Sequence, residues 1–77
     1  ARANEAARAF VQAVYAKAVL LAAGEQAASS RELASLVRKR VEIGEAAEVQ
    51  ALRAEIQARR YEQEVTSAQG QFDALLS

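Results

Sequence analysis

The side chains most able to bind a ligand or take part in a reaction are the charged residues on either side of Gly44. Glu42, Glu45 and Glu48 place three carboxylates within one short stretch. Carboxylate oxygens are the ligands that hard cations such as Ca²⁺ prefer. Three basic residues stand just before them, at positions 38–40. Because each carboxylate then has a cation nearby, neutralisation within the chain explains the cluster better than a metal site does, and we predict no metal site.

The residues needed for catalysis are scarce. The sequence contains no His and no Cys, so a nucleophile and base pair would require an activated Ser, Lys or carboxylate. Lys17 and Lys39 lie on ordinary polar faces of the predicted helices, and no glycine-rich phosphate-binding loop is present. These missing groups indicate that the chain is not an enzyme, and they predict no cofactor.

Charge and hydropathy narrow the set of partners. Ten basic and ten acidic residues give a net charge of zero, which lacks the positive excess of a nucleic-acid-binding surface. The longest apolar run spans residues 18–23, far short of the roughly 20 residues that a membrane-spanning helix needs. We therefore expect no nucleic-acid partner and a segment that lies outside the membrane.

The charged stretch must be positioned by two helices that meet at Gly44. Twenty alanines, no Pro and helical spacing of the apolar residues predict an all-α fold. Glycine adopts a left-handed backbone without steric cost, and it commonly follows the last residue of a helix. Basic residues before Gly44 and acidic residues after it suit the dipoles of one helix end and the next helix start. We predict an antiparallel two-helix coiled-coil hairpin, with a helix at about 2–43, a turn at about 44–47 and a helix at about 48–76.

Apolar spacing predicts which face each helix buries. In the second helix the seam follows alternate steps of three and four, a heptad pattern that runs through Ala51, Ala54, Ala58, Tyr61, Val65, Ala68, Phe72 and Leu75. In the first helix two neighbouring stripes have helical spacing, one through Val11, Val14, Ala18, Leu21 and Ala28 and the other through Tyr15, Val19, Ala22, Leu33, Val37 and Val41. Along the first helix, Arg38 and Glu42 have the i,i+4 spacing of an ion pair.

Chain length predicts a marginal monomer. A chain of 77 residues buries only about 60% of its extended surface, so we expect association with further protein. Residues before Val14 extend beyond the end of the second helix. Because the chain begins without Met and inside a helical pattern, we interpret it as a piece of a longer protein.

The stretch around Gly44 resembles a known turn. Residues 40–46 (RVEIGEA), followed by Val49, Leu52 and residues 53–55 (RAE), resemble the periplasmic turn of the outer-membrane efflux protein family, the TolC-like channels of tripartite pumps and type I secretion systems. In that family Arg, a small apolar residue and Gly close one helix, and a Leu-Asp-Val-Leu-x-Ala-Glu-like segment opens the next. Residues 9–14 are similar to an upstream family segment about thirty residues before the Arg, and residues 68–76 resemble the end of the family repeat.

The resemblance implies a homotrimeric channel whose α-helical barrel crosses the periplasm of a Gram-negative cell. The hairpin would then be a periplasmic segment of an outer-membrane protein, and its tip would dock on a periplasmic adaptor, also called the membrane fusion protein. Carried over residue by residue, the adaptor contacts are Arg40, Ile43, Gly44, Glu45 and Ala46.

Three positions depart from the common family pattern. Ala47 replaces a frequent Ser or other N-cap residue, and Gln50 replaces a usual Asp or Glu. Glu45 stands where drug-exporting channels often have Leu. The Gly44-Glu45 pair is similar to heavy-metal efflux channels of the CzcC type, which implies cation export. Since the chain has no transition-metal ligands, other parts of such a pump would select the substrate.

Two alternatives remain from the sequence. The first is the α-hairpin of the adaptor itself, which normally carries a Ser shortly after its tip Gly, where this chain has Ala46 and Ala47. The second is a free-standing hairpin that dimerises into a four-helix bundle and binds protein or RNA. Zero net charge and unequal arms argue against the RNA version. Flanking β-strands would indicate the channel, and flanking lipoyl or β-barrel domains the adaptor.

Overall fold

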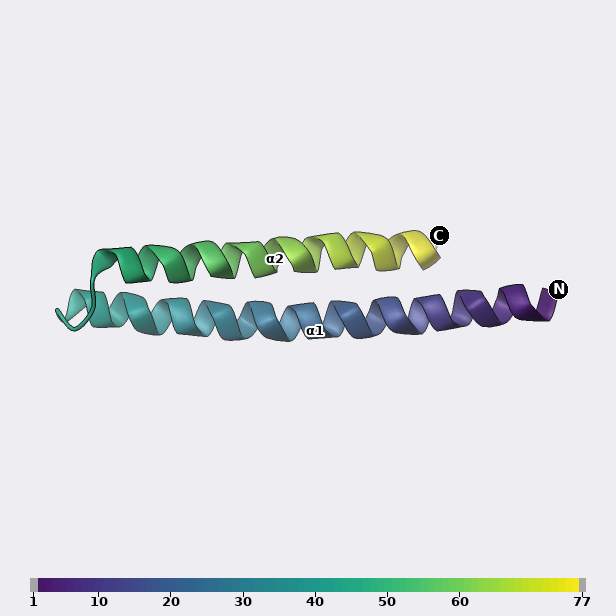
Figure 1. Ribbon diagram of the computed structural model, residues 1–77, viewed down its shortest axis with the longest axis horizontal. Helices are drawn as coiled ribbons and strands as arrows, with labels where there is room; N and C mark the ends of the chain where they lie inside the picture. The colour runs from purple at the N-terminus through teal and green to yellow at the C-terminus, as the bar shows by residue number, and fades with distance from the viewer. Residues whose placement is uncertain (1, 77) are drawn as a thin grey trace.

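The chain folds into two long α-helices joined by a short turn, as Figure 1 shows. This computed structural model describes residues 2–76. Helix α1 spans Arg2–Glu42 and helix α2 spans Glu48–Leu76. The two helices lie antiparallel and side by side, with overall dimensions of 64 × 14 × 13 Å. The sequence predicted this all-α hairpin, although α1 ends one residue earlier than expected.

The two arms differ in length. Helix α1 contains 41 residues and α2 contains 29, so the N-terminal part of α1 extends beyond the last residue of α2 (Figure 1). The overhang begins slightly nearer the N-terminus than expected, because Gln12 shares a hollow with the end of α2 and Ala13 is half-buried, although residues before Val14 were expected to have no partner in α2. The packing between the helices therefore runs from about residue 12 of α1 to the turn.

The interface between the helices is built from alanine. No large side chain among the described residues is fully buried, and the core consists of Ala23, Ala27, Ala34, Ala51, Ala58 and Ala68. Small side chains let two helix backbones approach closely, because nothing longer than a methyl group stands between them. Larger residues complete the interface only as half-buried side chains, which are Leu20, Val37, Val41, Tyr61, Val65 and Phe72.

The predicted seam of α2 is confirmed over most of its length. Ala51, Ala58 and Ala68 are buried, and every other predicted position except the last is half-buried. Leu75 differs, because 46% of it is exposed. It lies one residue before the end of α2, so no following helical turn covers it.

The predicted buried face of α1 is wrong at most positions. Only Val37 and Val41 lie at the interface, whereas Val11, Val14, Tyr15, Leu21 and Leu33 are more than half exposed. The residues that face α2 instead are Ala13, Ala16, Leu20, Ala23, Ala27, Ser30, Ala34, Val37 and Val41. The physical reason is the short distance between the two helices. Because they pack closely, mostly small residues fit in the seam, and most of the large apolar side chains of α1 lie on the outer surface.

Enlarging the alanine seam should destabilise the hairpin. Ala58 is fully buried, so Ala58→Leu would force the helices apart or push a side chain off its rotamer. Overpacking of this kind lowers the free energy of unfolding by about 1–3 kcal/mol. Thermal unfolding followed by circular dichroism, at equal chain concentration, measures the effect. Ala28→Leu is the matched control, because Ala28 is exposed and should change stability little; equal melting of the two variants would contradict a close-packed seam.

Candidate functional site at the tip

The turn at Gly44 is a Schellman motif, which ends a helix by satisfying its last carbonyls. The Gly44 N–H donates to the Val41 carbonyl at 3.1 Å, and the Glu45 N–H donates to the Arg40 carbonyl at 2.7 Å. Gly44 has φ = 81°, in the left-handed region that favours glycine. A Cβ added to Gly44 would meet no atom within 4 Å. The requirement for glycine is therefore a backbone requirement and not one of space.

The start of α2 has half of a capping box. Ala47 occupies the N-cap position, and its N–H donates to the Gln50 side-chain oxygen at 3.2 Å. The Gln50 N–H in turn donates to the Ala47 carbonyl at 3.0 Å. The methyl group of Ala47 cannot accept a hydrogen bond from the exposed N–H groups of the first turn, so the reciprocal half of the motif is absent.

Restoring a side-chain acceptor at the N-cap should stabilise the tip. Ala47→Ser would supply the missing hydroxyl oxygen, and the gain in the free energy of unfolding is expected to be about 1 kcal/mol. Urea unfolding compared with Ala46→Ser, which adds a hydroxyl one residue too early, measures the gain. Equal stabilisation by both substitutions would show that the cap position is not the cause.

The five predicted adaptor-contact residues lie together at the outer end of the hairpin. Ile43 is 68% exposed, and Arg40, Gly44 and Glu45 are also exposed, whereas Ala46 is half-buried. Within the described residues, the Arg40 side chain forms no hydrogen bond or ion pair. The last carbonyls of α1 accept from the backbone of the turn, as described for Gly44 and Glu45. The tip therefore presents one apolar side chain together with separate positive and negative groups.

Arg38 forms the ion-pair network nearest to the tip. Its Nη1 donates to both carboxylate oxygens of Glu48 at 2.8 and 2.9 Å. Its Nε and Nη2 donate to Glu55 Oε1 at 3.1 and 2.9 Å. The hydrogen bond to Glu48, followed by the one to Glu55, raises the pKa of the Arg38 guanidinium above its ordinary value, so the group stays cationic far into the alkaline range.

Arg38 does not use the i,i+4 spacing that it has with Glu42, because its hydrogen bonds go to Glu48 and Glu55. Arg38 lies on the flank of α1 that faces α2, so its guanidinium reaches across the hairpin and not along its own helix. A second pair, Arg31 with Glu62, joins the helices on the same flank farther from the turn. The sequence held a signal for this network, because the basic residues on α1 and the glutamates on α2 each recur every seven residues.

The carboxylates near the turn do not form a metal site in the part of the chain that the structure describes. No group of three or more potential ligands among residues 2–76 is arranged to hold a metal ion. Glu48 is instead held by Arg38. The neutralisation that the sequence predicted therefore occurs at Glu48, and it is made by a residue on the opposite helix.

Large apolar side chains form two stripes on the outer surface near the tip. We call Leu33, Leu36 and Ile43 the α1 stripe, and Val49, Leu52 and Ile56 the α2 stripe; each of these side chains is 46–68% exposed. At about 100° per residue, Leu33 lies on the opposite side of the α1 seam from Arg38, whereas Leu52 lies on the same side of the α2 seam as Glu55. Since Arg38 and Glu55 are paired, Leu33 and Leu52 lie on opposite flanks of the hairpin. The other four side chains lie roughly opposite the seam of their helix, so most of each stripe lies on the outer face that is turned away from the other helix.

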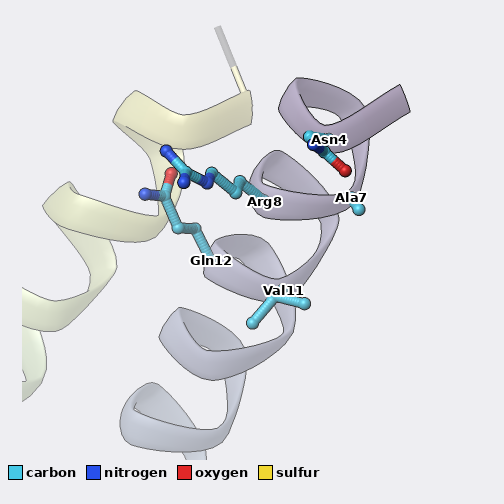
Figure 2. Close-up of a pocket in the computed structure, with 5 residues that line it drawn as sticks. All are labelled: Asn4, Ala7, Arg8, Val11 and Gln12. Carbon is cyan, nitrogen blue, oxygen red and sulfur yellow. The ribbon is translucent and has the colours of Figure 1, made fainter. Parts of the chain in front are cut away.

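Two shallow hollows lie at the open end of the hairpin. One lies along α1 alone and is lined by Asn4, Ala7, Arg8, Val11 and Gln12; Figure 2 shows Arg8 and Gln12 directed toward the α2 side. Another, of about 590 Å³, lies between the helices and is lined by Gln12, Tyr15, Ala16, Val19, Gln71, Ala74 and Leu75. Neither brings together groups with the chemistry of a catalytic site.

By length and composition alone, α1 could also cross a membrane. Residues Asn4–Glu42 contain an 18-residue window with a mean hydropathy of 1.3, of which 6% is buried. Arg8, Gln12 and Lys17 interrupt this N-terminal half of α1, and charged residues are costly in the hydrocarbon region of a bilayer. The outer apolar residues that raise its hydropathy equally suit packing against another helix.

Comparison of this chain with family models, with curated proteins and with solved structures finds no match in any of the three. Its function therefore has to be argued from the hairpin and its tip.

Proposed function

We propose that this hairpin is the periplasmic tip segment of an outer-membrane channel component of a tripartite efflux or type I secretion system, and that it docks on a periplasmic adaptor through residues 40 and 43–46. The observation that carries the proposal is the tip itself. A Schellman motif fixed by Gly44 presents Ile43 and Glu45 to solvent at the end of a long, narrow hairpin. Such an end can contact a partner while the two helices pack side by side with the helices of other hairpins in the barrel of the channel.

The outer apolar stripes favour this function over a free-standing dimer. The α1 stripe and the α2 stripe lie mainly on opposite outer faces of the hairpin, so each hairpin needs a further helix on both of these faces to cover them. Two copies paired through one outer face in a four-helix bundle would leave the other stripe in water. A closed ring of helices, as in the barrel of a homotrimeric channel, covers both stripes.

The charges at the tip suggest the kind of contact. An apolar side chain at Ile43 beside Glu45 and Arg40 suits an adaptor tip that offers a small apolar spot and a group of each charge. The Glu45 carboxylate after Gly44 further supports the heavy-metal branch of these channels, and heavy-metal cations are the substrate class that we propose. Since no three potential ligands among the described residues are grouped to hold a metal ion, we assign cation selection to other parts of the pump.

Site-specific crosslinking tests the docking. The unique cysteine variant Glu45→Cys, placed in the parent channel, should crosslink to the adaptor that is expressed with it, because position 45 is exposed at the tip. The matched control is Gln63→Cys, which is also exposed but lies in the middle of α2. Equal yields from both positions, or none from position 45, would count against docking through the tip. β-strands encoded on both sides of the hairpin would distinguish the channel from the adaptor alternative.

A further inference from the structure

Arg38 joins the two helices at the point where the tip begins. The segment between Arg38 and Glu48 contains the last residues of α1 and the entire turn, and the bidentate bond between these two side chains joins its ends. The same guanidinium holds Glu55, two helical turns farther along α2. One side chain therefore fixes both the first residue of α2 and the direction in which that helix leaves the turn.

The alanine seam beside Arg38 gives little register information of its own. Ala34 on α1 and Ala51 and Ala58 on α2 are buried in this seam, and methyl groups resemble each other at every level of the seam. Among the described residues at this end, only Val37 and Val41 add larger apolar side chains to the seam, and both are half-buried residues of α1, so few interlocking side chains oppose sliding of one helix along the other. Polar groups at single seam or flank positions are the best-attested means of setting register in such a case.

Arg38 is also better placed for this role than the other cross-helix pair. The Arg38 and Glu55 side chains are 33% and 31% exposed, whereas those of Arg31 and Glu62 are 51% and 48% exposed. Solvent and salt screen the second pair more strongly. Arg38 binds two carboxylates and Arg31 binds one.

We propose that Arg38 is a positioning residue for the tip: by holding Glu48 and Glu55 it sets the register of the two helices and keeps residues 43–47 in one conformation. The role can be measured without any partner. Its consequence for docking rests on the proposed function, since only a defined tip conformation can match an adaptor surface.

Amide hydrogen exchange of the 77-residue chain tests the role directly. The N–H groups of Gly44, Glu45 and Ala47 are hydrogen-bonded within the tip, so their exchange rates report its opening. In Arg38→Gln these amides should exchange roughly 3- to 10-fold faster. Arg31→Gln is the matched control and should leave the tip amides unchanged. Arg38→Lys should give an intermediate rate, because an ammonium keeps the charge but cannot hold two carboxylates with the same fork geometry.

Several outcomes would overturn this proposal. Faster exchange at the tip in both the Arg38 and Arg31 variants, or in neither, would show that Arg38 has no special role. Should Arg38→Gln fail to fold, Glu48→Gln and Glu55→Gln each remove one of the two ion pairs of Arg38. Unchanged exchange of the tip amides in both variants would contradict the positioning role.

The consequence for docking needs a separate measurement. In the parent channel, Arg38→Gln should lower crosslinking from position 45 to the adaptor several-fold, whereas Arg31→Gln should not. Faster tip exchange in Arg38→Gln, with no crosslink even in the unsubstituted channel, would refute the docking function and leave the positioning role standing.

Discussion

Export should be abolished when Gly44 is replaced by valine in the proposed parent channel, while trimer assembly and outer-membrane insertion stay intact. Gly44 has φ = 81°, a conformation that disfavours side chains with a Cβ by about 1–2 kcal/mol and β-branched residues by more. Because an added Cβ would meet no neighbour, the whole effect comes from the backbone. The turn would rearrange to relieve the strain, and Ile43 and Glu45 would move with it.

Gly44→Asn provides the matched control, because Asn tolerates the left-handed conformation better than other residues with a Cβ. A susceptibility assay, run together with the crosslink from position 45, should show loss in Gly44→Val and near-normal behaviour in Gly44→Asn. Normal resistance and normal crosslinking in the valine variant would reduce residues 40–46 to a simple turn.

Reversal of charge at Arg40 should also abolish export, by a different route. Arg40→Glu would place a carboxylate near Glu42 and Glu45 and at the negative end of the α1 dipole. The stability effect should stay within about 1 kcal/mol, since the side chain is exposed and makes no ion pair within residues 2–76. Arg40→Lys keeps the charge and serves as the control. Lost export with unchanged thermal unfolding would locate the defect in partner contact; unchanged export would remove Arg40 from the contact.

Helicity of the isolated chain should depend strongly on its concentration. The hairpin buries only alanines fully, whereas large apolar residues of the two outer stripes are exposed. Full burial of such a side chain contributes about 1.5–3 kcal/mol, so completing the burial of several of them between copies should add substantially to the stability that the alanine core provides. Circular dichroism over a dilution series, together with sedimentation, should show helix loss on dilution and self-association at high concentration.

Charged substitutions separate this association from intrinsic helix stability. Leu36→Glu and Ile56→Glu each disrupt one outer stripe and should shift the dilution midpoint upward, whereas the exposed control Gln63→Glu should not. A highly stable monomer whose melting temperature is independent of concentration would contradict the prediction.

The fold could be predicted from the sequence because its main determinants are local. Gly44 and the charges around it mark the turn, and in α2 the alanine positions follow the same heptad as larger apolar residues, so the pattern is visible. In α1 helical spacing alone predicts the wrong face, because several stripes have that spacing and the predicted ones run through exposed residues such as Val14 and Leu33. Their exposure follows from the close packing of the alanines, which is a property of the pair of helices and not of either one.

The candidate site was predictable only in part, because its contacts also depend on how the two helices pack together. Residues 40 and 43–46 were chosen by resemblance to a family turn, and the structure places them at one exposed end without testing a contact. The Arg38 network was missed because its partners depend on register, and register depends on how many residues the turn contains. The i,i+4 spacing pointed to Glu42, but Glu48 and Glu55 on α2 together offer two carboxylates, and the Glu55 side chain is only 31% exposed.

The alanine seam has a consequence for the calorimetry of this protein. The heat-capacity change of unfolding grows with the apolar area exposed, by roughly 0.45 cal/mol/K for each Å². Separating two helices that bury little beyond methyl groups exposes a small area, so the isolated hairpin should have a shallow, weakly curved stability profile with temperature. In the proposed channel, most of the heat-capacity change would arise when the outer stripes of neighbouring helices separate, so the assembled wall of helices, and not the single hairpin, would be the cooperative thermal unit.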